Sequence, residues 1–166
     1  MNHQEFITHI NPFKDKLYRI AKRMLISVEE AEDATQEVIY KLLKSDLTAL
    51  KNMEAMAVTM TKNYCFDQLK AKRSFNLKLV HTNYSDASSL EKQIVDRDSY
   101  SKVEEIINHL PEQQRLIVQL REIEEYEFAE IAKIMDMNET AIRVSLSRAR
   151  KIIKEKYTEL NNYGNR

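Results

Sequence analysis

The chain of 166 residues contains a single glycine, Gly164, which lies near the C-terminus. Phosphate-binding loops, dinucleotide-binding turns and nucleophile elbows all need internal glycines, because their backbones approach a ligand closely or turn sharply. Tight β-hairpins need glycines as well, so the lack of them argues against a sandwich or a barrel. The rest of the chain is rich in Leu, Ile, Met, Ala, Glu and Lys, which favours helices. We therefore predict an all-α fold.

The cysteine content and the hydropathy of the chain indicate the cellular compartment in which we expect it. Cys65 has no second cysteine with which to form an internal disulfide or a zinc site. Residues 1–12 are polar and lack the apolar core of a signal peptide. No stretch approaches the roughly 18 apolar residues of a membrane span, the mean hydropathy is -0.56, and 31% of the residues are charged. We expect a cytoplasmic protein with no membrane insertion.

Charge is balanced overall but segregated along the chain. Lys and Arg total 26, and Asp and Glu also total 26. Acidic residues gather at 29–37 and 122–130, whereas basic residues gather at 62–78 and 143–156. Such a chain can bind an anionic polymer with one part and a basic protein surface with another. Solvated helix faces give the same pattern, so charge alone leaves both interpretations open.

The N-terminal part, residues 6–73, has a strong helical period. Apolar residues between positions 17 and 25 fall on one helix face. Residues 27–30 (SVEE) predict a capping box that opens a second helix. A polar break at 45–52 precedes a third helix, from about Met53 to Lys72. The second helix is expected to bury Ala31, Ala34, Val38 and Leu42.

The helical period is lost between residues 74 and 98. The central stretch, HTNYSDASS, cannot bury enough apolar surface to offset the entropy of ordering it. Order resumes with a second capping-box pattern at residues 101–104 (SKVE), and Pro111 ends the following helix and can open the next one. We therefore predict two small helical domains, residues 1–73 and 99–166, joined by a flexible linker at 74–98.

The sharpest local signal is in the C-terminal part. Residues 128–135 form a short amphipathic helix with the small Ala132 at its centre, and Asn138 suits the N-cap of a longer helix that runs to about Tyr157. This spacing predicts a helix-turn-helix, whose second helix fits a major groove about 12 Å wide. A helical hairpin with a solvated basic face is the alternative. The second helix is expected to bury Ile142, Leu146, Ala149 and Ile153, and to present Arg143, Ser147, Arg150 and Lys154.

Residues 31–38 (AEDATQEV), with Asn63, Asp67 and residues 70–73 further along, form a recognisable pattern. They resemble region 2 of the extracytoplasmic-function (ECF) sigma factors of bacteria: residues 31–38 are similar to the segment that docks on RNA polymerase, and the others resemble the end of that region. The resemblance covers about residues 6–73 and 99–158, and it implies two helical domains. The segments that resemble region 4 are 110–115 (LPEQQR), 120–124 (LREIE), 130–132 (EIA) and 148–150 (RAR).

One acidic face suits a protein partner. Asp33, Gln36, Glu37 and Tyr40 lie at i, i+3, i+4 and i+7, so they project from one side of a helix. Carboxylates and an amide on one face can meet an Arg-rich helix through charge-assisted hydrogen bonds. The resemblance implies that this partner is the coiled coil at the clamp of core RNA polymerase. An ordinary solvated face is the alternative.

The third helix carries an amide and several cations. Asn63, Asp67 and Lys70 lie at i, i+4 and i+7; an amide can pair with a base edge, while Lys70, Lys72 and Arg73 can hold phosphates. The resemblance implies that this half melts the minus 10 promoter element and holds a flipped base, with the loop at 44–52 forming part of the pocket. Asn63 could instead bond to Asp67. The rings of Tyr64 and Phe66 either stack on bases or belong to the core.

The resemblance implies that the second helix of the helix-turn-helix reads the minus 35 element. Arg143 is the best candidate for a contact to a base edge. Lys151, Lys154 and Arg150 are expected to meet phosphates, although Arg150 could instead pair with Glu155 or Glu127. The expected DNA contacts of this helix are Thr140, Arg143, Val144, Ser145, Ser147, Arg148 and Lys151.

The sequence also departs from the ECF pattern. Glu125, at the turn before the helix-turn-helix, stands where the family often has glycine, and the family often has another glycine near Asp136. The loss of both suggests a tighter or more helical connection. Ser145 and Ser147 stand where the family often has an arginine and a ring-bearing side chain. The promoter preference of relatives therefore does not carry over to this chain.

Together these patterns predict an alternative sigma factor that binds core RNA polymerase and promoter DNA. An anti-sigma partner is common in the family, although no residue here demands one. We expect no enzyme activity, metal or cofactor, since the four histidines are scattered and Cys65 lies between two aromatic residues. The alternatives are a stand-alone helix-turn-helix regulator and a helical adaptor that binds only protein.

Overall fold

The computed structural model describes residues 2–45, 52–79 and 99–164. These residues form helices and no strand, which confirms the all-α prediction. The order is α1 (His3–Leu25), α2 (Val28–Lys44), α3 (Met53–Leu79), α5 (Ser99–Asn108), α6 (Glu112–Val118), the π-helical turn η2 (Gln119–Ile123), α7 (Phe128–Met135) and α8 (Glu139–Gly164). Below, α1–α3 are called the N-terminal half and α5–α8 the C-terminal half.

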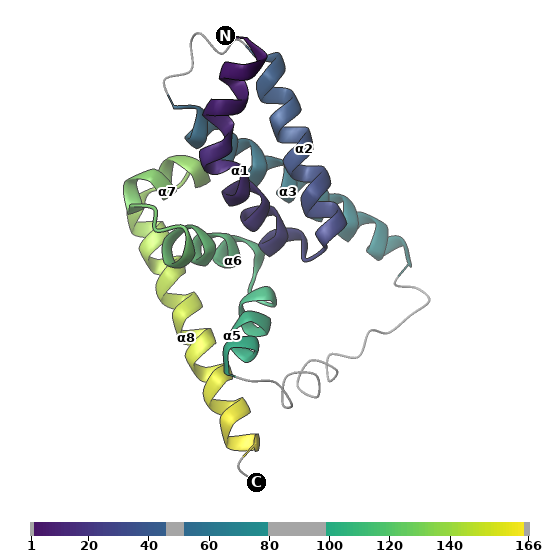
Figure 1. The fold of residues 1–166 in the computed structure, drawn as a ribbon. Coiled ribbons are helices and arrows are strands. Elements are labelled where there is room, and N and C mark those ends of the chain that lie inside the picture. The colour runs from purple at the N-terminus through teal and green to yellow at the C-terminus, as the bar shows by residue number, and fades with distance from the viewer. Residues whose placement is uncertain (1, 46–51, 80–98, 165–166) are drawn as a thin grey trace.

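The three N-terminal helices pack around one apolar stripe of α1. Asn2 caps α1, because its side chain accepts from the backbone N–H of Glu5 at 2.8 Å while the Glu5 carboxylate accepts from the N–H of Asn2 at 3.0 Å. α1 lies against both α2 and α3 (Figure 1). The fully buried side chains here include Leu17, Ile20, Met24, Val38 and Leu42, as the helical period predicts.

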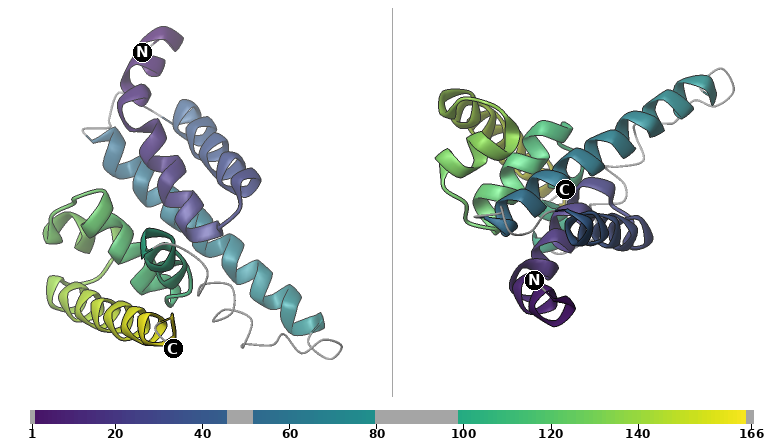
Figure 2. Two further views of the ribbon diagram at one scale, coloured as in Figure 1. Left: turned by 60° about the horizontal axis from the view of Figure 1, so that its bottom comes forward. Right: turned by 90° about the horizontal axis from the view of Figure 1, so that it is seen from above.

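The ends of α2 and α3 differ in part from the sequence predictions. Ser27 caps α2 by accepting from the N–H of Glu30 at 3.3 Å, but the Glu30 carboxylate turns to Lys72 on α3, at 2.6 Å, instead of completing a capping box. α3 continues past Lys72 to Leu79, and its last turns extend away from the other helices (Figure 2). Residues 46–51 of the predicted loop and 80–98 of the predicted linker lie outside the described residues.

In the C-terminal half, α5 begins earlier than the sequence suggests. The helix starts at Ser99, so Ser101 lies within its first turn and the predicted capping box at residues 101–104 is wrong. Ser99 and Tyr100, the two helical residues before Ser101, are exposed, so the helix includes them through its backbone rather than through burial of their side chains. Pro111 stands at the N-cap of α6, where its carbonyl oxygen accepts from the N–H of Arg115 at 2.8 Å. Its missing N–H leaves no helical hydrogen bond unmade.

Glu125, where the ECF family often has glycine, and Asp136, near which it often has another, both have a glycine-like backbone. Glu125 has φ 60° and Asp136 has φ 53°, both in the left-handed region that other residues seldom occupy. The turn before Glu125 is helical, as predicted, but η2 is a π-helix and therefore wider, not tighter. Ile26, at the end of α1, is also left-handed with φ 63°, an unusual conformation for a β-branched residue.

The two halves share one hydrophobic core. α1 and α3 contact α6, η2 and α7, and the buried cluster runs without a break from residues of α1 to residues of α6 and α7. Figure 1 shows α6 and α7 lying against the N-terminal helices, with α8 behind them and running toward the C-terminus. Leu17, Leu116, Leu120 and Ile131 are all fully buried members of this cluster. The described helices therefore form one packed body.

Candidate nucleic-acid interface

The helix-turn-helix forms where the sequence predicts it. α7 spans Phe128–Met135 and α8 begins at Glu139, as expected. Asn138 is the N-cap residue, since its Oδ1 accepts from the N–H of Ala141 at 2.7 Å. The left-handed Asp136 reverses the chain between the two helices. Ile131, Ile134, Ile142 and Leu146 fill the space between α7, α8 and the core.

One face of α8 points to solvent, and it carries most of the residues predicted to contact DNA. Ser145 is the exception: it is only 8% exposed, so this candidate is placed on the buried side of α8 rather than on the outer face. The physical reason is its spacing, because it stands three residues after Ile142 and four before Ala149, both fully buried. The exposed candidates are Thr140, Arg143, Val144, Ser147, Arg148 and Lys151.

The cations on α8 differ in how far they are already paired. Arg148 and Lys154 make no ion pair with any described residue, so their charges are free for a ligand. Arg150 is occupied, because Nε and Nη2 lie 2.7 Å and 2.5 Å from Oε1 of Glu122. Its partner is thus Glu122, neither of the two predicted residues. Arg143 lies only loosely near Glu139, at 4.0 Å.

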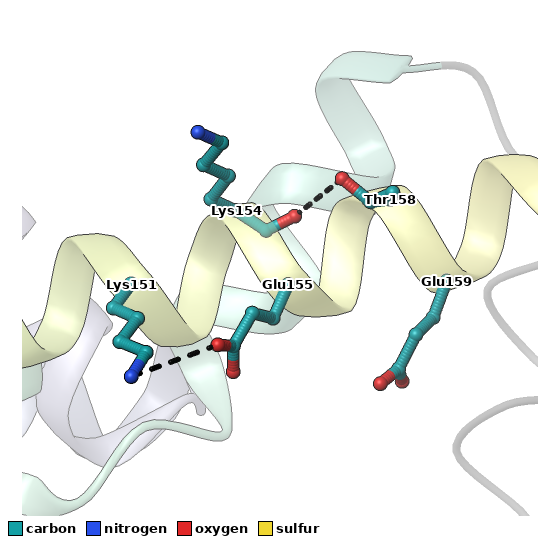
Figure 3. Close-up of a pocket in the computed structure, with 5 residues that line it drawn as sticks. All are labelled: Lys151, Lys154, Glu155, Thr158 and Glu159. Carbon is teal, nitrogen blue, oxygen red and sulfur yellow. Dashed lines mark hydrogen bonds and ion pairs between the residues drawn. The ribbon is translucent and has the colours of Figure 1, made fainter.

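An open hollow of ≈ 480 Å³ lies along the C-terminal part of α8. Figure 3 shows that Lys154 projects from one side of the helix, while Lys151 and Glu155 project from the other. Lys151 Nζ lies 4.0 Å from Glu155 Oε1. Because carboxylates and ammonium groups alternate here, the hollow suits no ligand of one charge sign. The residues that line it are Lys151, Lys154, Glu155, Thr158 and Glu159.

The predicted minus 10 residues on α3 lie on its exposed side. Asn63, Asp67 and Lys70 are exposed, and among the described residues no hydrogen bond joins Asn63 to Asp67. The amide of Asn63 is therefore not held by its neighbour on the helix. Two other candidates are already paired: Lys72 with Glu30, and Arg73 with Glu112 on α6.

The aromatic pair on α3 belongs partly to the core. Tyr64 and Phe66 are half-buried and pack against the buried cluster, so both predicted alternatives keep some support. Cys65 between them is fully buried. Burial raises the pKa of the Cys65 thiol to about 12, which keeps it protonated and unreactive near neutral pH.

The predicted polymerase-docking face lies along α2. Asp33 and Gln36 are exposed, and Glu37 lies 3.6 Å from Lys41 in an exposed pair one turn away. Tyr40 is 52% exposed, and the ammonium of Lys44 lies 4.5 Å from the centre of its ring. The four predicted residues thus form one solvent-facing stripe with an acidic start and an aromatic end.

Sequence reasoning missed a set of buried polar contacts between the two halves. Arg23 of α1 is 8% exposed, and its Nε donates to Gln119 Oε1 at 2.8 Å. Its Nη1 donates to Asn108 Oδ1 at 2.8 Å and lies 2.9 Å from Glu104 Oε2. One guanidinium of the N-terminal half is therefore surrounded by three oxygens of the C-terminal half.

Two further arginines reinforce this junction. Arg19 binds Glu124 with two nitrogens, Nε at 2.9 Å and Nη2 at 2.6 Å from Oε1, and the Glu124 side chain is only 1% exposed. Arg115 reaches in the opposite direction, from α6 to the carbonyl oxygen of Met24, and also to that of Asn108, both at 2.9 Å. We call the contacts of Arg19, Arg23 and Arg115 the arginine junction.

A tyrosine and a carboxylate complete the contact between the halves. The hydroxyl of Tyr126 donates to Glu54 Oε1 at 3.0 Å, and Lys16 Nζ lies 2.5 Å from the same oxygen. Burial and the neighbouring Glu54 raise the pKa of Tyr126. Although burial alone would raise it, hydrogen bonds from Lys16 and Tyr126 hold the pKa of Glu54 below its usual value. The charged form of Glu54 is thus the one that this contact stabilises.

One feature of the sequence does point to the arginine junction. Arg23 lies three residues after Ile20 and beside Met24, at the edge of the buried stripe of α1, and an arginine in such a place needs a partner. The partners lie 85 and 96 residues away, in Asn108 and Gln119. Helical periodicity does not identify contacts over that separation.

Other kinds of site find no support in the described part of the chain. It contains no group of three or more His, Cys, Asp or Glu residues placed to hold a metal ion. It also contains no helix that is both long and apolar enough to cross a membrane.

Comparison with known proteins agrees with this geometry. The family model of Sigma-70 region 2 matches residues 9–75, and that of Sigma-70 region 4 matches residues 100–153. The ECF RNA polymerase sigma factor SigW of Bacillus subtilis is 21% identical over 168 residues, covering 93% of this chain and 90% of that protein. The ECF RNA polymerase sigma factor BldN of Streptomyces coelicolor is 27% identical over 144 residues, covering 82% of this chain but 54% of that protein.

A solved structure has the same fold. The sigma factor RpoE, crystallised with the anti-sigma factor NepR from Bartonella quintana, superposes with a TM-score of 0.71 at 17% identity, covering 93% of this chain and 98% of that one. The fold and the two matched regions define a sigma factor, a class of transcription initiation factors rather than enzymes. The chain belongs to the sigma-70 family, whose regions 2 and 4 match residues 9–75 and 100–153, and the two relatives named above are extracytoplasmic-function sigma factors.

Proposed function

We propose that the chain binds core RNA polymerase, places it on a promoter and helps to open the DNA, without catalysis of its own. The observation that carries the proposal is the coincidence of the two sigma regions with two exposed helix faces, on α3 and α8, each of which carries several polar groups without a partner among the described residues. We place this activity in the bacterial cytoplasm, where polymerase and chromosome meet. A regulatory anti-sigma factor is a further proposed partner.

The proposed polymerase contact is the exposed stripe of α2. Asp33, Gln36 and Glu37 offer carboxylate and amide oxygens to basic side chains of the partner, and Tyr40 adds a half-exposed ring. Among the described residues, the cations in contact with this stripe are Lys41 and Lys44, which are exposed and lie on the same helix. Such pairs are weak in water, so a partner arginine can replace them at little cost.

The proposed minus 35 contact is the outer face of α8. Arg143 is placed to read a base edge in the major groove, with Ser147 and Arg148 beside it. Lys154 lies about two turns beyond Ser147 and about three turns beyond Arg143 on the same face. It has no ion pair among the described residues, so its charge suits a phosphate. Thr140, Val144 and Lys151 complete the proposed surface, from which the buried Ser145 is removed.

The proposed minus 10 contact is the exposed side of α3. The exposed amide of Asn63, which has no hydrogen-bond partner among the described residues, suits a base that has left the stack, and Asp67 and Lys70 lie on the same side. Extruding a base costs a few kcal/mol, which contacts in the protein must offset. Lys72 and Arg73 also belong to the proposed surface, and each would first have to leave its carboxylate partner.

The two rival functions explain less of the chain. A stand-alone helix-turn-helix regulator accounts for residues 100–153 but has no need of a sigma region 2 over residues 9–75. An adaptor that binds only protein has no need of the free Arg148 and Lys154 on α8 or of the free amide on α3. The sigma-factor function uses all of these features.

Run-off transcription tests the proposal directly. Purified chain is mixed with core polymerase lacking any sigma factor and with a set of candidate promoters, and specific transcripts are expected only when both proteins are present. Asp33→Lys with Glu37→Lys should weaken competition with another sigma factor for core polymerase. Glu155→Lys with Glu159→Lys is the matched control, because it reverses two exposed charges away from α2. Equal competition by both variants would remove the α2 stripe from the proposal.

Opening of the DNA is tested at Asn63. Asn63→Ala should leave polymerase binding nearly unchanged but reduce open complexes, because the contact forms only after the strands separate. A promoter mismatched in the minus 10 region should partly rescue this variant, and Asn11→Ala, an exposed amide on α1, serves as control. Permanganate reactivity of unpaired thymines gives the measurement. If Asn63→Ala opens the matched promoter as well as the unaltered chain does, Asn63 holds no flipped base.

A further inference from the structure

Arg143, the proposed base-reading residue, rests on an aromatic ring. Phe128 is the first residue of α7, and the guanidinium carbon of Arg143 lies 4.7 Å from the centre of its ring. This distance is within the range of a cation–π contact. The side chain of Arg143 is nevertheless 59% exposed. The ring therefore contacts Arg143 on one side and leaves most of its side chain exposed to solvent.

The ring of Phe128 is itself held in place. It is half-buried and packs against the hydrophobic core. A second guanidinium, that of Arg121, lies 4.3 Å from the ring centre. Arg121 is anchored by a hydrogen bond from Nη1 to the carbonyl oxygen of Tyr126 at 2.9 Å and by Glu127 at 3.7 Å. Phe128 is thus held by the core on one side and by a second, anchored arginine.

The geometry of a guanidinium explains what such a platform achieves. All five N–H donors of arginine lie in one plane, so stacking against the ring occupies the flat face and leaves the donors free. Among the described residues, Arg143 has an ion pair only with Glu139, whose carboxylate is 4.0 Å away and beyond hydrogen-bonding distance. Arg143 therefore keeps the paired donors that recognise O6 and N7 of guanine. Arg148, on the same helix, has no ring contact among the described residues.

We propose that Phe128 is a positioning residue that holds Arg143 in its base-reading orientation and thereby sharpens base discrimination by α8. A flexible exposed arginine loses rotamer freedom when it binds, and pre-organisation reduces that loss. Phe128 itself touches no base. The inference rests on the proposed function of α8 as the reading helix, and it adds the residue that makes the reading selective.

A double-mutant cycle tests the role. Holoenzyme made from core polymerase and the full chain is offered a duplex library randomised over the upstream promoter element, and the bound fraction is sequenced at fixed salt. Arg143→Ala should relax preference at one base pair by about tenfold or more. Phe128→Leu should relax the same position by about two- to fivefold, the effect of losing a cation–π contact at an exposed site. In the Arg143→Ala background, Phe128→Leu should have no further effect at that position.

Rescue and spectroscopy separate positioning from a loss of packing. Phe128→Tyr keeps the ring and should restore the preference. In the free chain, the side-chain protons of Arg143 should resonate upfield because of the ring, move back in Phe128→Leu and stay upfield in Phe128→Tyr. If Arg143→Ala leaves base preference unchanged, the assignment of α8 fails. If Arg143→Ala relaxes the preference while Phe128→Leu acts equally with and without Arg143, the reading helix stands and the positioning role is overturned.

Discussion

The arginines of the junction and those on the outer face of α8 are the same residue type in opposite situations. Arg23 is 8% exposed and meets oxygens of Glu104, Asn108 and Gln119. Arg148 is exposed and has no partner among the described residues. A buried guanidinium without partners would be very costly, whereas an exposed one remains hydrated until a ligand arrives. The number of partners, rather than the residue type, distinguishes a structural arginine from a binding one.

Arg143 and Arg150 lie between these extremes. Arg150 is exposed but paired with Glu122, so its charge is mostly used within the protein. Arg143 is exposed and stacked on Phe128 with its donors free. The comparison therefore predicts three separate outcomes of arginine removal: loss of stability at the junction, loss of base preference at Arg143, and loss of uniform affinity at unpaired cations.

The largest effect is expected at Arg23. Arg23→Ala leaves the carboxylate of Glu104 and the amides of Asn108 and Gln119 without their partner, so the free energy of unfolding should fall by about 3–5 kcal/mol. Denaturant unfolding followed by circular dichroism gives the value. Arg148→Ala, an arginine without partners, is the matched control and should stay within about 0.5 kcal/mol. Equal losses for the two variants would break the comparison.

A smaller effect, and one of a different kind, is expected at Arg143. Arg143→Ala should cost about 1–3 kcal/mol of binding at a single base pair of the upstream element, with the unfolding free energy nearly unchanged because the side chain is exposed. Binding of holoenzyme to duplexes that differ at one position gives the measurement. A uniform loss on all sequences would instead make Arg143 a phosphate contact.

The smallest effect is expected in the pair Lys154 and Lys151. Lys154 is free, so Lys154→Ala should reduce the slope of log affinity against log salt by about 0.9, the value for one lost phosphate contact. Lys151 already faces Glu155 at 4.0 Å, so Lys151→Ala should reduce the slope by less. Filter binding over a series of salt concentrations compares them. A larger change for Lys151 would show that the pairing seen here does not govern phosphate contact.

Much of the helical framework was predictable because it is encoded locally. The bounds of α7, the N-cap at Asn138 and the buried stripes of α1 and α8 all depend on residues within a few turns of one another. The burial of Ser145 could also have been predicted from the buried stripe of α8, since Ser145 lies between Ile142 and Ala149 on that face. It was missed because its place in the family pattern suggested an outward role.

The contacts that join the halves were not predictable in this way. The bond from Arg23 to Gln119 spans 96 residues, and that from Arg19 to Glu124 spans 105. Nothing in the local pattern around either arginine identifies such a distant partner. The end of α3 at Leu79 was also missed, because its exposed last turns, with Phe75 and Leu77, show no amphipathic period. Site residues on exposed faces were easier to propose, because exposure follows from the local period alone.

The arginine junction also limits the distance along DNA that the two proposed DNA-contacting helices, α3 and α8, can span. The minus 10 and minus 35 elements lie about 25 base pairs apart, or ~85 Å at about 3.4 Å per base pair. That is about twice the ~40 Å length of a helix with as many residues as α3. Because α3 packs directly against α7, the described arrangement does not let α3 and α8 reach both elements of one promoter at once.

The packed arrangement of the two halves would therefore compete with binding to the two proposed promoter elements. If only a fraction of free chains has separated halves, the apparent dissociation constant for a two-element target equals the intrinsic one divided by that fraction. Each contact made by Arg19, Arg23 and Arg115 lowers the fraction and so weakens apparent binding. A substitution that loosens the junction would then act with opposite signs on two quantities, decreasing the stability of the folded chain while increasing the share of molecules ready to span a promoter.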